Sequence, residues 1–132
     1  MEMTVSRTGP AAPQDVWRHY RQLALWTRWA PHLTRVRADS SVLLPGIEGT
    51  VTALGLVRAR FRVLDVAEDQ RQWAWAVRLG PVRLLLEHHV TPVPGGGSRA
   101  DVRIQGPAPV LVAYEPVMGW ALSRLVRVGR RD

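Results

Sequence analysis

The 132-residue chain contains no cysteine, no lysine and no asparagine. The lack of cysteine excludes a disulfide framework and any metal site with thiolate ligands. No apolar run approaches 18 residues, and no basic stretch followed by an apolar run opens the chain, which argues against a membrane span and a secretory leader. We therefore expect a cytoplasmic protein without membrane insertion, folded as a single domain over residues 1–132.

The absence of lysine also changes the meaning of the net charge of +7. All 18 basic residues are arginine, and the chain has two isoleucines and one phenylalanine. Because the scarce residue types need AT-rich codons, this composition indicates GC-rich coding, and part of the arginine excess reflects codon use. The arginines are scattered, apart from one alternating triplet and a basic C-terminus, and no groove-reading motif or aromatic-rich RNA surface accompanies them. We expect no nucleic-acid partner, although the charge permits a weak attraction to polyanions.

Hydropathy patterning predicts one strand, two short helices, about six strands and a long helix. Residues 1–8 alternate as a half-buried strand does, and residues 13–24 carry apolar side chains at helical spacing behind Pro13. The stretch LWTRWAPHL (25–33) predicts a second short helix that Pro31 ends. The short connections between the following strands indicate antiparallel neighbours. In chain order these strands are expected over residues 33–39, 49–55, 57–66, 71–79, 82–90 and 99–105.

An apolar stripe at helical spacing from residue 109 onward predicts the long C-terminal helix. Pro116 lies inside this stripe and should kink or break the helix, because proline removes a backbone hydrogen bond. One face of the sheet must be covered, and only this helix is long enough to cover it.

Several segments in this order resemble the START-related helix-grip superfamily, also called SRPBCC, and most of all its polyketide cyclase/dehydrase branch. The resemblance covers essentially the whole chain, including the terminal helix with its internal proline. It implies an α+β fold: a strongly bent antiparallel β-sheet wrapped around a long C-terminal helix, with two short helices after the first strand. The segments are VWRHY (16–20), LWTRWAPHL (25–33), GIEGTVTALG (46–55), FRVLDV (61–66), WAWAVRL (73–79) and HHVTPVPGGGSRADVRIQGP (88–107).

The resemblance further implies a largely apolar cavity between sheet and helix that holds lipids, hormones or polyketides. Two departures from the family pattern bear on this cavity. The first helix ends in QLALW where the family usually has an acidic residue, and the C-terminal helix is a turn or more shorter than usual. A shorter helix leaves the cavity more open or lets a second subunit close it, so a homodimer is one possibility.

The histidines do not have the spacing of a metal site. His88 and His89 are adjacent on a strand and point to opposite faces, while His19 and His32 have no partner at ligand spacing. No serine lies in a Gly-x-Ser-x-Gly turn, and GGGSR joins two strands as a hairpin instead of leading into a helix. We therefore expect neither a metal nor another cofactor.

Two residues are candidates for catalysis. His88 shares a strand face with Leu84 and Leu86, so burial should lower its pKa and leave a neutral imidazole for general acid/base chemistry. The alternative is a core histidine that hydrogen-bonds a neighbour. The second is Arg60, one of three alternating arginines at 58, 60 and 62. Because Phe61 should face inward, alternation places these arginines on the solvated face. A strand bulge would turn Arg60 inward, toward a ligand carboxylate or enolate.

Aromatic residues dominate the predicted ligand-binding set, because rigid aromatic walls suit flat or polyene ligands. We expect Trp29 to form a pocket wall and Trp26 to pack the elbow against the C-terminal helix. We assign no chemistry to His32, which should only lead into a strand. The full predicted set is Trp26, Trp29, Tyr20, Phe61, Trp73, Trp75, Leu86, Tyr114 and Met118.

These observations and the resemblance predict a protein that binds a hydrophobic, polyketide-like small molecule in an internal cavity. The expected activity is cyclisation or dehydration of that molecule in secondary-metabolite biosynthesis, as a lyase or isomerase. The alternative is a non-catalytic carrier or sensor of a hydrophobic ligand, because a fold does not determine a function.

Overall fold

The computed structural model describes residues 1–129 as seven strands and a set of helices in the predicted order. All seven strands form one antiparallel sheet, with the spatial order β1-β7-β6-β5-β4-β3-β2. The strands are β1 (Glu2–Gly9), β2 (Leu33–Ala38), β3 (Glu48–Ala53), β4 (Val57–Ala67), β5 (Gln72–Leu79), β6 (Val82–Pro92) and β7 (Ser98–Gln105). The helices are α1 (Pro13–Arg21), η1 (Leu23–Leu25), α2 (Trp26–Trp29), η2 (Glu68–Gln70) and α3 (Ala108–Leu125).

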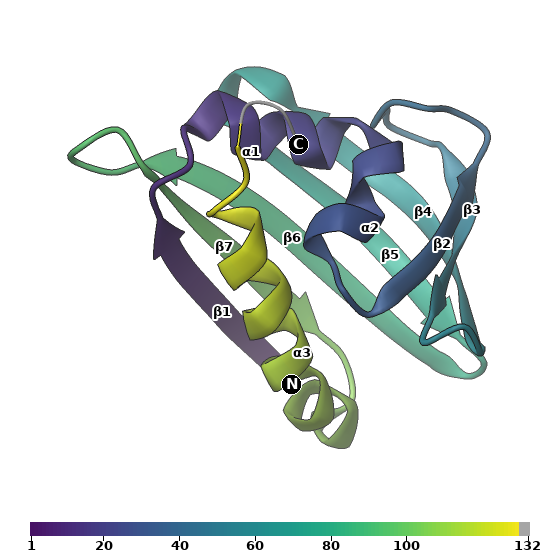
Figure 1. Cartoon of the computed structure of the whole chain (residues 1–132). Helices are drawn as coiled ribbons and strands as arrows, with labels where there is room; N and C mark the ends of the chain where they lie inside the picture. Colours follow the sequence, from purple (N-terminus) through teal and green to yellow (C-terminus); the bar gives the residue numbers. More distant parts are fainter. Residues whose placement is uncertain (130–132) are drawn as a thin grey trace.

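The helices α1, α2 and α3 lie on one side of the curled sheet (Figure 1). Helix α3 packs chiefly on β1 and β7, α1 on β6, and α2 on β2. The sheet therefore curls around the helices, and a space remains between α3 and the strands β3, β4, β5 and β6. This arrangement confirms the predicted α+β helix-grip fold.

Proline sets the boundaries of the short helices as expected. Pro13 opens α1, where its missing N–H is no loss, and Ala30 takes an extended conformation before Pro31 and ends α2. Pro116 was expected to kink or break the last helix, and the break is wrong, because α3 runs without interruption from Ala108 to Leu125. Pro116 lies on the exposed side of α3, while buried residues such as Leu111 on other sides of the helix hold it against the sheet.

Strand alternation separates the two faces of the sheet. Phe61 and Val63 are buried on the inner face, next to the helices, whereas the arginines at 58, 60 and 62 are exposed on the outer face. The one register shift between β4 and β5 lies between Val63 and Asp65 and leaves Arg60 directly opposite Arg78. Arg60 therefore does not turn inward. No helix within residues 1–129 combines the length and the apolar character that crossing a bilayer requires.

Candidate functional site

An apolar cavity of about 290 Å³ lies between the inner face of the sheet, α2 and the first half of α3. Strands β3, β4, β5 and β6 form its floor. Among residues 1–129, only His32, His88 and Tyr114 bring polar side chains other than indole to the wall. The lining residues are Trp26, Trp29, Ala30, His32, Leu33, Val51, Ala53, Leu54, Val57, Ala59, Trp73, Trp75, Val77, Leu79, Leu84, Leu86, His88, Val110, Tyr114, Val117 and Met118.

His88 lies in the cavity wall with both ring nitrogens engaged. The indole Nε1–H of Trp75 donates a hydrogen bond to Nε2 of His88 over 2.9 Å, and the other ring nitrogen, Nδ1, is 3.0 Å from the hydroxyl of Tyr20. An indole N–H can only donate, so Nε2 is unprotonated and the neutral ring carries its proton on Nδ1. Nδ1–H therefore donates to the Tyr20 oxygen.

Burial controls the ionisation of this group. Desolvation lowers the pKa of His88 from 6.5 to about 3, because the charged imidazolium would have no water around it. Desolvation also raises the pKa of Tyr20 above its ordinary value, with the charge of Asp101 adding to the effect. At neutral pH both groups are uncharged, and they form a fixed hydrogen-bonded pair.

Three tryptophans form the aromatic wall beside His88. The Trp73 ring stacks on the His88 ring with a centroid distance of 4.4 Å and an interplanar angle of 9°. Trp26 approaches Trp73 at 5.5 Å and Trp75 at 5.2 Å, and its own N–H donates to the backbone oxygen of Tyr20. These contacts hold each ring in place, so the wall is pre-formed.

A second polar pair, His32 and Tyr114, lies in the cavity lining near the end where β3 passes into β4. The Tyr114 hydroxyl and Nε2 of His32 are 3.3 Å apart, although 82 residues separate them in the chain. Burial lowers the pKa of His32 and raises the pKa of Tyr114 to about 12, so the histidine is neutral and the phenol protonated at neutral pH. Nδ1 of His32 is buried and has no hydrogen-bond partner among the described residues.

Most of the predicted ligand-binding residues line the cavity, and two do not. Tyr20 and Phe61 are buried but lie behind the wall: Tyr20 supports His88, and Phe61 packs against Trp26 and Trp75. The predicted residues in the lining are Trp26, Trp29, Trp73, Trp75, Leu86, Tyr114 and Met118.

One further expectation needs correction, and one residue has an additional role. Arg60 is exposed on the outer face of the sheet, so it cannot reach a ligand in the cavity, and we remove it from the candidate site. Trp26, expected at the elbow, contacts the aromatic side chains of the sheet and also lines the cavity.

His32 is the polar residue of the cavity lining to which the sequence analysis gave no role, and several aliphatic lining residues were also not predicted. The only sequence signal for His32 is its position directly after Pro31, where the chain turns from α2 into β2. Among residues 1–129 no group of three or more histidine, aspartate or glutamate side chains is placed to hold a metal ion.

The curled sheet, the helices on its inner face and the apolar cavity define an SRPBCC-type helix-grip protein. Residues 1–130 match the family described as "Polyketide cyclase / dehydrase and lipid transport", and the chain belongs to this family. No curated protein matches the chain significantly. Family and fold together indicate a protein that binds a hydrophobic ligand.

Solved structures share the fold at low sequence identity. Protein MLL2253 from Mesorhizobium loti is 17% identical, with a TM-score of 0.80 over 96% of this chain and 95% of that chain. XoxI from Bacillus cereus is 12% identical, with a TM-score of 0.81 over 96% and 93% of the two chains. The hypothetical protein jhp0584 from Helicobacter pylori is 14% identical, with a TM-score of 0.77 over 95% and 84%. At these identities the likeness concerns the fold alone.

Proposed function

We propose that the protein is a non-catalytic carrier that binds one small hydrophobic molecule in its cavity. The observation that carries the proposal is the cavity wall itself: it is almost wholly apolar, and its aromatic rings are already fixed. Apolar pockets with a few placed polar groups are typical of small-molecule sites. Removing a hydrophobic molecule from water into such a pocket is favourable in proportion to the apolar area covered.

The cavity volume limits the size of the ligand. A volume of about 290 Å³ is near the lower end of ligand pockets and equals about ten water volumes of about 30 Å³ each. This space suits a molecule of about 10 to 15 non-hydrogen atoms, such as a one- or two-ring aromatic compound. A larger polyketide chain would extend out of the cavity into solvent.

The state of His88 favours binding over catalysis at that residue. A general acid or base must reach the substrate and have a pKa near the working pH. Both nitrogens of His88 are occupied by Trp75 and Tyr20, and its pKa is about 3. In the proposal His88 therefore keeps the wall in shape, and it corresponds to the core histidine of the alternative hypothesis.

Binding of 2-naphthol, measured by titration calorimetry, tests the proposal. Ala59 lines the cavity on β4, whereas Ala76 lies on the outer face of β5 beyond the same wall. We expect the wild type and Ala76→Phe to bind equally well, and Ala59→Phe to lose at least about tenfold in affinity, because the new ring occupies ligand space. Equal binding by a folded Ala59→Phe variant would refute the cavity as the site.

A second candidate function is cyclisation or dehydration, and the pair of Tyr114 and His32 favours it. In an aldol closure, a base takes a proton from the carbon beside one carbonyl, the new carbon–carbon bond forms, and an acid gives a proton to the oxygen of the other carbonyl. In dehydration, the base takes a second proton from the same carbon, and the hydroxyl takes a proton from the acid and leaves as water. A neutral imidazole can accept the carbon proton while a phenol next to it donates to the oxygen, and the imidazolium then returns a proton to the phenolate. His32 and Tyr114 both line the cavity, so in this candidate function they take the catalytic roles that the sequence analysis gave to His88 and Arg60.

Tyr114→Phe separates the two candidates. For a carrier, the variant should bind 2-naphthol about 2- to 12-fold more weakly, which corresponds to one hydrogen bond, and should bind naphthalene normally. For an enzyme, conversion of a small β-polyketone should fall about a hundredfold or more while its binding changes little. Conversion of such a substrate by the wild type would itself contradict the carrier proposal.

A further inference from the structure

The outer face of the sheet gathers arginines that are scattered in the sequence. The strand register places Arg37, Thr50, Arg60, Arg78 and Arg83 in one continuous row across β2, β3, β4, β5 and β6. Neighbouring strands are about 4.8 Å apart, so this row sets four guanidinium-bearing residues across the sheet.

A shorter row lies beside it, nearer the end of the sheet. Arg35 pairs with Thr52, and Thr52 pairs with Arg58. The six arginines at 35, 37, 58, 60, 78 and 83 are all exposed, and we call them the arginine face. Within residues 1–129 none of their side chains makes an ion pair or a hydrogen bond.

Elsewhere on the outer face, carboxylates pair with arginines. Arg103 contacts Glu2 and Glu87 at 3.1 and 2.7 Å, and Arg62 lies 4.0 Å from Glu48. The half of this face at β1 and β7 therefore has paired arginines, and Arg62 on β4 is paired as well, whereas the six arginines of the arginine face have no ion pair within residues 1–129.

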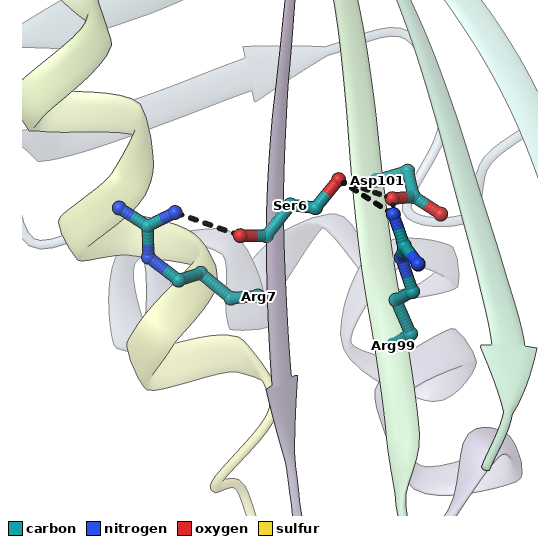
Figure 2. Close-up of polar contacts among 4 residues, drawn as sticks. All are labelled: Ser6, Arg7, Arg99 and Asp101. Atoms are coloured by element: carbon teal, nitrogen blue, oxygen red, sulfur yellow. Dashed lines mark hydrogen bonds and ion pairs between the residues drawn. The ribbon is translucent and has the colours of Figure 1, made fainter.

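Figure 2 shows the paired half at β1 and β7. Asp101 accepts hydrogen bonds from Ser6 and from Arg99, the latter over 3.0 Å. Arg99 therefore contacts an acidic partner, whereas no arginine of the arginine face contacts one within residues 1–129.

The arginine face places like charges directly opposite one another. Arg78 is the register partner of Arg60 on one side and of Arg83 on the other. Like charges in directly opposed positions destabilise a sheet. Bound anions between these side chains would remove the repulsion, and guanidinium groups bind phosphate oxygens in a bidentate manner.

Exposed leucines lie at the same end of the sheet. Leu54 and Leu56 flank the turn between β3 and β4 and are 73% and 87% exposed, and Leu79 at the end of β5 is 42% exposed. Leu54 and Leu79 also line the cavity, so the cavity reaches the surface between the two hairpin tips. Arg58 and Arg78 lie within a few residues of these leucines on the outer face.

We infer that this end of the molecule docks on an anionic lipid bilayer. The leucines of the hairpin tips enter the interfacial region, and the arginine face binds lipid phosphates beside them. The open end of the cavity then faces the lipid, and a hydrophobic ligand passes between bilayer and cavity without crossing water. Nucleic acid fits this surface less well, because stacking on bases needs exposed aromatic rings, and the exposed tryptophan, Trp120, lies on α3.

Co-sedimentation with vesicles tests the inference. We expect binding to phosphatidylcholine vesicles that contain about one-third phosphatidylglycerol, at about 50 mM salt, and little binding to pure phosphatidylcholine. Arg60→Gln/Arg78→Gln should lower the vesicle partition coefficient by up to about thirtyfold, since each arginine near an anionic surface contributes a factor of about five and the two factors multiply. The matched control, Arg28→Gln/Arg127→Gln, removes two exposed charges on the helix side and should bind as the wild type does.

A leucine pair of variants tests the apolar part of the contact. Leu56→Gln should weaken vesicle binding severalfold, whereas Leu64→Gln, on the outer face away from the tips, should not. The inference would be overturned if the protein did not bind anionic vesicles. It would also be overturned if the two double arginine variants lost vesicle affinity to the same extent. The inference would also be overturned if the protein bound duplex DNA more tightly than anionic vesicles and if Leu56→Gln did not change that DNA binding. Binding of 2-naphthol by the same variants reports separately on the cavity, so this inference and the proposed function can fail independently.

Discussion

Replacing His88 tests whether its imidazole is a structural group. In His88→Leu the Trp75 indole N–H loses its acceptor and the Tyr20 hydroxyl loses its donor, and both are buried. Each unsatisfied group costs about 1–3 kcal/mol, and the lost stacking on Trp73 adds about 1 kcal/mol. We expect the free energy of unfolding to fall by about 3–7 kcal/mol, a large share of the stability of a small domain.

His88→Gln is the matched control, because an amide has both an acceptor and a donor but does not titrate. It can still accept from Trp75 and donate to Tyr20. We therefore expect it to lose less than half as much stability as His88→Leu does at pH 7.

The pH dependence of stability gives an independent readout. Burial lowers the pKa of His88 from 6.5 in the unfolded chain to about 3, so between these values only the unfolded state binds the proton. Stability is therefore complete above pH 6.5 and is lost as the pH falls toward 3, by about 1.4 kcal/mol per pH unit from this group. The pKa of His32 is also lowered and contributes in the same direction. The difference in the pH dependence of stability between the wild type and His88→Gln isolates the contribution of His88.

Urea denaturation followed by tryptophan fluorescence at pH 7 and pH 5 measures both effects. The wild type should lose more stability than His88→Gln on acidification. If His88→Leu is within about 1 kcal/mol of the wild type, or if the two pH slopes coincide, the imidazole is neither structural nor shielded. It would then be available for the chemistry first predicted for it.

Three other substitutions test single features of the fold. Pro116→Ala should raise the free energy of unfolding by about 2 kcal/mol in chemical denaturation, because α3 is already continuous and gains a backbone donor; a loss would mean that the helix needs its proline. Gly49→Ala should lower the melting temperature, with a cost of about 3 kcal/mol, since a Cβ there would lie 2.7 Å from the Phe61 ring and closer still to a backbone oxygen; an unchanged melting temperature would contradict this packing. Arg103→Gln should cost less than about 1 kcal/mol in the same assay, because its ion pairs with Glu2 and Glu87 are about half exposed; a larger loss would indicate a cooperative network.

The fold was predictable from sequence because its strands alternate clearly and its turns carry glycine or proline. Alternation reports which residues share a face, and the inner positions of β5 and β6 were predicted correctly on that basis. Helix α3 was predicted less well, since the local rule for Pro116 does not include the packing of the rest of the helix.

The site was harder to predict because alternation gives the face of a residue and not its depth. Tyr20 and Phe61 were expected to contact a ligand, but other rings lie between them and the cavity. His32 lies in an irregular elbow, and its partner Tyr114 is 82 residues away, so no local pattern links them. The arginine face depends on strand register across five strands, which composition and spacing do not reveal.

The tryptophan wall has an optical consequence. The ring centroids of Trp26, Trp73 and Trp75 are 5.2 to 5.5 Å from one another, a separation at which the electronic transitions of indoles couple and excitation migrates between rings. The three rings absorb and emit as a set, with a near-ultraviolet circular dichroism signature of their own. A molecule that enters the cavity touches this set directly, so the protein reports its own occupancy without an added label.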